Sequence, residues 1–213
     1  MITVKQFTFN DFQENTYILS DPSLETIIID PGCNTGEEMQ LVEDYIKNKN
    51  LKPVKLINTH CHIDHVLGNS FIAKTFGLEL AVHPAEVELL EAVESYSKLY
   101  RIQYDKSPVP SIFLEEDQKI RFGNSILKIL FVPGHSPGHL AFLDSEQKFI
   151  IGGDVLFQGS IGRTDLPGGN YETLIRSIRT KFIPLGDEHT VYPGHGPSTN
   201  IGFEKIHNPF LTN

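Results

Sequence analysis

The most constraining feature of the sequence is a cluster of metal-binding residue types in the segment Lys55–Asn69, KLINTHCHIDHVLGN. Three histidines and one aspartate (His60, His62, Asp64 and His65) fall within six residues of a chain that holds nine histidines in 213 residues. Imidazole nitrogens and carboxylate oxygens are the groups that bind zinc, iron and similar divalent metals. A polar loop with surface histidines is the alternative, and it does not account for the further candidate ligands later in the chain. The cluster therefore predicts a metal site.

Composition excludes several classes of partner. A hydrophobic content of 39% and a charged content of 21% describe an ordinary globular protein. The net charge of −9, without a run of lysine or arginine, argues against nucleic acid and anionic membranes as partners. No segment reaches the ~20 apolar residues that span a bilayer, and residues 1–11 do not resemble a signal peptide. Two cysteines, Cys33 and Cys61, do not make a disulfide framework. We expect a cytoplasmic protein that is a monomer or a small homo-oligomer.

Hydrophobic periodicity predicts strands interspersed with helices along the whole chain. The predicted strands cover residues 2–9, 15–19, 26–29, 54–58, 78–82, 112–114, 119–122, 126–132, 140–143, 149–151 and 190–192. The predicted helices cover residues 37–48, 68–76, 84–104 and 172–182. Because no low-complexity linker divides the chain, we expect one domain over residues 1–213. In that domain two sheets pack face to face, with the helices outside.

Three later segments each place a further metal-binding residue at the end of an apolar strand, beside glycine or proline. These residues are His135, Asp154 and His195. Strand ends at one edge of a layered sheet converge in space, and glycine lets the backbone bend sharply there. We therefore expect these residues to join the first cluster in a shared site.

The spacing of the first cluster predicts two metals rather than one. His60 and His62 are two residues apart, so in an extended segment both side chains project to the same side. Asp64 and His65 follow after a turn and point at a neighbouring position. Two metals need a bridging group, and Asp154, with two carboxylate oxygens, is the natural candidate.

Three motifs of this chain resemble those of the metallo-β-lactamase superfamily. Thr59–Asn69, Pro133–His139 and Gly152–Phe157 are most similar to the glyoxalase II-like (hydroxyacylglutathione hydrolase) branch. The resemblance covers essentially the whole chain. It implies an α/β fold, a four-layer αβ/βα sandwich with the site at the edge between two β-sheets.

The resemblance also implies a ligand set for two divalent metal ions, with zinc expected and iron or manganese compatible. The first metal is held by His60, His62 and His135. The second is held by Asp64, His65 and His195, and Asp154 bridges the two. Asp30, at a strand end before Pro31, resembles an aspartate that orients a ligand histidine. A turn-forming aspartate is the competing interpretation.

The activity implied by the resemblance is hydrolysis of a small-molecule thioester, S-2-hydroxyacylglutathione, by a metal-bound hydroxide that Asp64 orients. Arg163 is the candidate substrate contact, because a guanidinium binds a glutathione carboxylate bidentately. A structural ion pair between Arg163 and Asp165 is the alternative. We expect His139 to brace its loop by hydrogen bonding and Cys61 to pack away from the metals.

Long glyoxalase II proteins carry a separate C-terminal helical domain that grips glutathione. This chain ends shortly after Asn208–Leu211, and Thr212 stands where a basic residue is expected. We therefore expect the short type, without that domain.

Other activities occur on the same fold. A mononuclear iron persulfide dioxygenase acting on glutathione persulfide needs only His60, His135 and Asp154, so sequence does not separate it cleanly from the hydrolase. The acidic charge disfavours a nuclease. The pair Asp64–His65 and the aspartate at 154 disfavour a β-lactamase.

Overall fold

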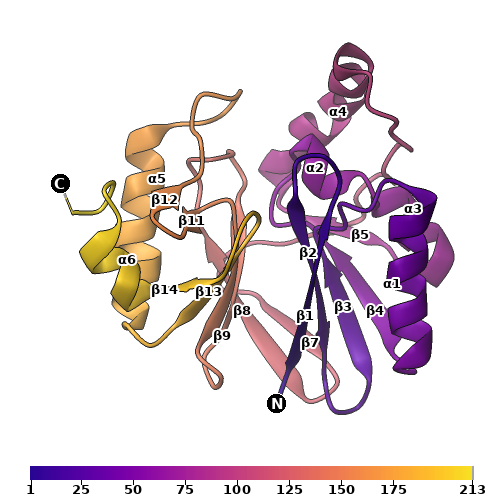
Figure 1. The fold of residues 1–213 in the computed structure, drawn as a ribbon, viewed down its shortest axis with the longest axis horizontal. Helices are drawn as coiled ribbons and strands as arrows, with labels where there is room; N and C mark the ends of the chain where they lie inside the picture. Colours follow the sequence, from indigo (N-terminus) through magenta and orange to yellow (C-terminus); the bar gives the residue numbers. More distant parts are fainter. Residues whose placement is uncertain (213) are drawn as a thin grey trace. The chain divides into compact units, whose positions relative to one another are not determined.

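The structure is a computed structural model that describes residues 1–212. The chain forms two compact units (Figure 1). The first comprises residues 1–114 and 121–126, and the second comprises residues 115–120 and those from Leu127 onward. The single domain expected over residues 1–213 stays a prediction.

The first unit is built on a six-stranded mixed sheet with strand order β1-β2-β3-β4-β5-β6 (Figure 1). The strands are β1 (Thr3–Phe9), β2 (Glu14–Ser20), β3 (Glu25–Ile29), β4 (Lys52–Ile57), β5 (Leu80–Val82) and β6 (Ile112–Phe113). β1, β2 and β3 pair antiparallel, whereas β3 to β6 pair parallel. Parallel pairing requires crossovers. Helices in the crossovers are α1 (Gly36–Asn48), α3 (Asn69–Phe76) and α4 (Val87–Tyr100).

The crossover helices share one hydrophobic core with the sheet of the first unit. Ile28 of β3 and Leu56 of β4 belong to the same buried cluster as Val42 of α1, Ile72 of α3 and Val93 of α4. The residues just before both strand ends are buried, Ile29 in β3 and Leu56 and Ile57 in β4, so the core holds the two strand ends in place. Both strand ends carry predicted site residues.

The fourth helix differs from its predicted bounds of 84–104. It begins as a 3-10 turn at Pro84–Glu86, capped by the His83 ring, which accepts a hydrogen bond from the Ala85 amide at 3.1 Å. The α-helix then ends at Tyr100. Arg101 adopts the left-handed conformation with φ 57°, and its amide bonds back to carbonyls of the last turn. This left-handed cap terminates the helix before residue 104.

The second unit is built on another six-stranded sheet, with strand order β14-β13-β10-β9-β8-β7. The strands are β7 (Lys119–Phe122), β8 (Ser125–Phe131), β9 (Leu140–Asp144), β10 (Phe149–Gly153), β13 (Thr190–Pro193) and β14 (Thr199–Asn200). β10 pairs parallel with β13 and antiparallel with β9. A separate two-stranded hairpin joins β11 (Leu156–Phe157) to β12 (Ser160–Ile161).

Two helices pack on the sheet of the second unit. Leu174 of α5 (Tyr171–Ser177) and Ile201 of α6 (Ile201–His207) share a buried cluster with Ile150 of β10 and Val191 of β13. The helix predicted over 172–182 is α-helical only to Ser177 and continues as a π-helical turn. Asn170 caps its start, accepting a hydrogen bond from the Thr173 amide at 2.8 Å.

Most predicted strands and helices are present within two residues of their expected bounds, but the short elements were missed. These are α2 (Ile63–Val66), β11, β12, β14 and α6. Short elements carry too few residues for a periodic pattern, so sequence periodicity does not detect them. Among residues 1–212, no helix combines the length and apolar character needed to cross a membrane.

Gly68 lies so close to neighbouring atoms that a side chain there is expected to destabilise the fold. A Cβ at Gly68 would lie 2.6 Å from Cys33 Sγ and 2.7 Å from Pro31 O, whereas a Cβ at Gly36 would meet nothing within 4 Å. We expect Gly68→Ala to lower the free energy of unfolding by about 1–3 kcal/mol through overpacking. Gly36→Ala is the matched control and is expected to be neutral or stabilising by about 0.5 kcal/mol. Denaturant titration of both variants measures this, and equal stabilities would contradict the packing described.

Candidate metal centre

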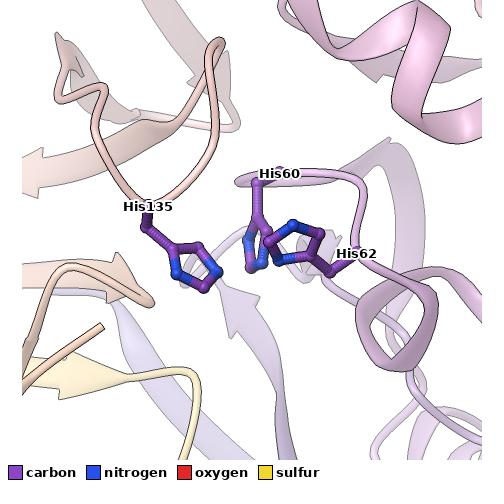
Figure 2. Close-up of side chains that lie close together, drawn as sticks. All are labelled: His60, His62 and His135. Carbon is purple, nitrogen blue, oxygen red and sulfur yellow. The ribbon is translucent and has the colours of Figure 1, made fainter. Parts of the chain in front are cut away.

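The loop after β4 presents His60 and His62 side by side (Figure 2). Their ring centroids are 4.8 Å apart and the rings are nearly perpendicular. Cys61, between them, is only 1% exposed and belongs to the hydrophobic core of the first unit. Side chains alternate along an extended segment, so placing Cys61 in the core turns both histidines to the other side. The predicted packing role of Cys61 is confirmed.

Asp64 and His65 lie on α2, a single helical turn that follows the loop directly. His65 Nε2 is 3.6 Å from Asp64 Oδ2, and the His65 ring is 4.1 Å from the His60 ring, centroid to centroid. Two ligand atoms bound at about 2.0–2.2 Å to one tetrahedral ion lie about 3.3–3.6 Å apart. The separation within this pair therefore fits two ligands of one metal ion.

Asp30, at the end of β3, contacts the ring of His65 from the other side. Its Oδ2 is 3.2 Å from His65 Nδ1 and accepts a hydrogen bond from Thr59 Oγ1 at 2.6 Å. Its Oδ1 accepts a hydrogen bond from the Thr59 amide at 2.6 Å. The contact between the Asp30 carboxylate and His65 Nδ1 leaves the Nε2 nitrogen of that ring to face Asp64. Asp30 adopts φ 49°, so it serves the turn as well, and both interpretations drawn from sequence hold.

Thr59 extends this support to His60. Its hydroxyl lies 3.0 Å from His60 Nδ1 and donates to Asp30. Because the Thr59 hydroxyl donates its hydrogen to the Asp30 carboxylate, it can only accept a hydrogen bond from the N–H at His60 Nδ1. His60 Nε2 is then unprotonated, and its lone pair can bind a metal. Sequence reasoning missed Thr59, and its place directly before the histidine is the signal that was available.

Glu14 is a second buried carboxylate near His65 that sequence reasoning missed. Its Oε1 lies 3.7 Å from His65 Nδ1, and its Oε2 accepts a hydrogen bond from Thr16 Oγ1 at 2.9 Å. Complete burial raises the pKa of Glu14 well above its usual value, while the neighbouring His65 opposes the shift. Strand β2 is buried along its whole length, so no periodic pattern marked this glutamate as different from a surface residue.

The other three predicted ligands lie in the second unit, at adjacent strand ends. The parallel pairing of β10 with β13 sets Gly153 opposite Pro193, so the residues that follow, Asp154 and His195, emerge at the same edge. Asp154 Oδ2 is 3.5 Å from His195 Nε2 and also 3.5 Å from His135 Nε2. Each of these two distances is the one expected between two ligand atoms that bind the same metal ion.

The loop that carries His135 is fixed by α5. His135 Nδ1 donates to the backbone carbonyl of Arg163 at 2.8 Å, so Nδ1 is the protonated nitrogen and Nε2 is the one that can bind a metal. Gly134 adopts φ 131°, and a Cβ there would lie 2.2 Å from the Leu174 amide nitrogen. Ser177 Oγ donates to Pro133 O at 2.7 Å. Only glycine permits this approach of loop to helix.

His139 and Arg163 were predicted to have roles other than metal binding, and both have hydrogen-bond partners in the structure. His139 Nε2 accepts a hydrogen bond from the Asp154 amide at 3.0 Å, so it braces the β10 end as predicted. Arg163 forms a bidentate ion pair with Asp165, with both N–O distances 2.7 Å, and both side chains are largely exposed. The Arg163 hydrogen bond lowers the pKa of Asp165 to about 2. The alternative ion pair is therefore present, and the substrate contact stays a prediction.

The predicted ligands form two groups, one in each unit. In the first unit the side chains that lie together are His60, His62, Asp64 and His65. In the second unit they are His135, Asp154 and His195. Each group consists of imidazole nitrogens and a carboxylate, with three of the five rings held through the Nδ1 nitrogen. These donor sets fit a divalent transition metal.

Comparison with known proteins bears on fold and family. The family model described as the metallo-β-lactamase superfamily matches residues 9–195. The hydroxyacylglutathione hydrolase GloC of Haemophilus influenzae is 39% identical over 94% of this chain and 93% of its own length. The structure of the BLEG-1 B3 metallo-β-lactamase matches with a TM-score of 0.90 and 33% identity, covering 99% of this chain and 100% of that one. The structure of TTHA1623 in a di-iron-bound form matches with a TM-score of 0.87 and 36% identity over 98% and 100%.

These matches confirm the resemblance and the predicted α/β fold class. Helices flank the sheet in each unit, as that class requires.

The two cysteines provide a chemical test of the packing around the centre. Cys33 and Cys61 are free and at most 1% exposed. Burial raises the pKa of both thiols above the usual value, so at pH 8 the thiolate fraction is smaller than for an exposed cysteine. We expect no reaction with a thiol reagent in the native protein and two equivalents after denaturation. Rapid labelling of either thiol in the native state would contradict this placement.

Proposed function

Because the chain belongs to the metallo-β-lactamase superfamily, we propose that it is a binuclear metal-dependent hydrolase of thioesters. Hydrolase-named relatives over almost the full length support hydrolysis as the reaction class. The observation that carries the binuclear proposal is the position of Asp154, whose Oδ2 lies 3.5 Å from both His135 Nε2 and His195 Nε2. A carboxylate beside two imidazoles is suited to bridge two metal ions.

The proposed assignment is the one that the family resemblance implies. One metal is held by His60, His62 and His135, and the other by Asp64, His65 and His195. Asp154 bridges the two metals. The pairing of Asp64 with His65 at 3.6 Å supports placing these two on the same metal. We propose zinc for both positions. Imidazole and carboxylate ligands also accept iron, and the structure of the relative TTHA1623 is in a di-iron-bound form.

When bound, two divalent metals supply an acidified water and a Lewis acid for the thioester carbonyl. The chain supplies neutral imidazoles with fixed ring orientations. Asp30 holds His65, the Thr59 hydroxyl contacts His60, and the Arg163 carbonyl holds His135, each through Nδ1. We propose that Asp64 would accept a hydrogen bond from the attacking water and so orient the water's lone pair toward the carbonyl carbon.

The reaction adds water to the acyl carbon and breaks the carbon–sulfur bond, giving a carboxylate and a thiol. A thiolate is a good leaving group, so no strong general acid is required. We propose S-2-hydroxyacylglutathione as the substrate, on the support of the relative named hydroxyacylglutathione hydrolase. Arg163 is the proposed contact for a substrate carboxylate. Its exposed pair with Asp165 contributes little stability, so a carboxylate can displace Asp165 at small cost.

The remaining predictions on location and organisation are carried here as proposals. Two free buried cysteines support a reducing cytoplasm. We also propose that residues 1–213 work as one domain on a small-molecule substrate.

We expect chelator-sensitive hydrolysis of S-lactoylglutathione by the purified protein, with activity restored by added zinc. Asp154→Asn is expected to abolish turnover and to lower bound metal from about two to about one or fewer per chain, because it removes the charged bridging oxygen. Thiol release followed with a chromogenic reagent measures turnover, and elemental analysis measures metal. Asp144→Asn is the matched control, since Asp144 lies on β9 and accepts hydrogen bonds from the Glu146 and Gln147 amides.

Two parallel assays define what would contradict the thioesterase. Turnover of a chromogenic cephalosporin with none of the thioester would instead agree with the relative named a B3 metallo-β-lactamase. One iron per chain with oxygen uptake on glutathione persulfide would favour the dioxygenase.

A further inference from the structure

The helical turn α2 cannot satisfy its own carbonyl groups. It consists of four residues, Ile63–Val66, and the last four carbonyls of any α-helix lack an intrahelical partner. Asp64, His65 and Val66 are all buried, so water does not replace the missing partners. A turn of this length depends on donors from elsewhere in the chain.

Three side chains from distant segments supply these donors, one for each of three successive carbonyls. They are Asn10 Nδ2 to Asp64 O at 3.1 Å, Asn58 Nδ2 to His65 O at 2.9 Å, and Ser107 Oγ to Val66 O at 3.4 Å. We call this set the α2 carbonyl caps. One comes from the β1–β2 turn, one from the end of β4 and one from the loop after α4.

The caps at Asn58 and Ser107 are themselves held in place. Asn69 Nδ2 donates to Asn58 Oδ1 at 2.8 Å and to Ser107 Oγ at 3.1 Å. Tyr104 OH lies 2.9 Å from Ser107 Oγ, and the Ser107 amide donates to the same phenol oxygen. Asn58 is completely buried and Ser107 is 7% exposed. This connected network of buried polar groups fixes the orientation of two caps.

The third cap is fixed at the surface. Asn10 adopts φ 53°, its amide donates to Glu38 Oε1 at 2.7 Å, and its Oδ1 accepts from the Phe12 amide at 2.9 Å. The remaining group, Nδ2, reaches both Gly32 O and Asp64 O. Asn10 therefore joins α2 to the turn that follows Asp30.

The segment carrying His60 and His62 is held by a different group. Glu86 is completely buried, and its Oε2 accepts a hydrogen bond from the Cys61 amide at 2.7 Å. The backbone of the two halves of the metal-binding cluster thus has separate supports, whereas Asp30 contacts the His65 ring directly and the His60 ring through Thr59.

We propose that Asn10, Asn58 and Ser107 are positioning residues that fix Asp64 and His65, and that they set the affinity of the metal these two hold. The inference rests on the proposed function for that metal. Removal of a cap leaves a buried carbonyl unsatisfied, so α2 shifts and the two ligands lose their common alignment. Outer hydrogen-bond partners of metal ligands typically change metal affinity by about 10–100-fold. The caps act mainly on one metal, because Glu86 supports the backbone of the other segment.

The test compares Asn10→Gly, Asn58→Ala and Ser107→Ala with Glu86→Gln. Glycine accepts the positive φ of residue 10, so this variant removes the cap without backbone strain. Asn50→Gly is its matched control, because Asn50 has φ 52° and is exposed. Stepwise zinc affinity is measured by chelator competition on the whole protein, and the apoprotein is followed by amide hydrogen exchange.

We expect each cap variant to weaken one of the two zinc-binding steps by about 10–100-fold and to leave the other unchanged. Glu86→Gln is expected to weaken the other step, and Asn50→Gly neither. In the apoprotein, the His65 amide, which donates to His62 O at 3.1 Å, should exchange faster in the cap variants. The Ile72 amide of α3, which donates to Gly68 O at 3.0 Å, should not.

Two results would overturn the inference. One is that the cap variants bind zinc with the affinities of the wild-type protein and that their His65 amide exchanges at the wild-type rate. The other is equal weakening of both steps in the cap variants and in Glu86→Gln, which would indicate general destabilisation. Wild-type protein that binds a single zinc contradicts the proposed binuclear function instead. The exchange rates of His65 and Ile72 then still decide whether the caps hold α2.

Discussion

The hydrogen bond to the second ring nitrogen of a metal-binding histidine is the interaction on which the candidate centre depends. A histidine that binds metal through one ring nitrogen almost always donates its other N–H to a fixed acceptor. Three different acceptors meet this need here: the Asp30 carboxylate for His65, the Thr59 hydroxyl for His60, and the Arg163 backbone carbonyl for His135. Asp30 and Thr59 lie directly after β3 and β4, and Arg163 lies in the loop after β12. The core of each unit is therefore what orients the rings.

Close backbone packing limits how these loops can vary. A Cβ at Gly162 would lie 1.9 Å from the Asp154 carbonyl oxygen and 3.1 Å from His135 Nδ1. Gly134 has a comparable contact with the backbone of Leu174 in α5. Glycine at these two positions lets the loops approach the ligands without displacing them. The glycines beside the predicted ligands thus have a specific physical role, which sequence analysis expected only in general terms.

Much of the fold and of the ligand chemistry could be predicted from the sequence. The residues that hold the candidate ligands in place could not. Apolar strands that end in His135, Asp154 and His195 give a strong local signal, because residue type and strand end coincide in the chain. The contacts of Glu14, Thr59 and Glu86 depend instead on pairing between segments 25 to 51 residues apart, or on burial that the local pattern does not reveal. Helix α2 was missed because four residues show no periodic pattern, and its carbonyls are satisfied by Asn10, Asn58 and Ser107 rather than by its own turns. The role of Arg163 stayed open, because its pair with Asp165 leaves either interpretation possible.

X-ray absorption spectroscopy of the zinc-loaded protein tests the central claim most directly. Two metals bridged by one carboxylate predict a metal–metal distance of about 3.5–4 Å. Ligation is expected from nitrogen and oxygen alone at about 2.0–2.2 Å, because the buried Cys61 thiol packs in the core. A sulfur neighbour at about 2.3 Å, or no metal–metal scattering at full loading, would contradict the account.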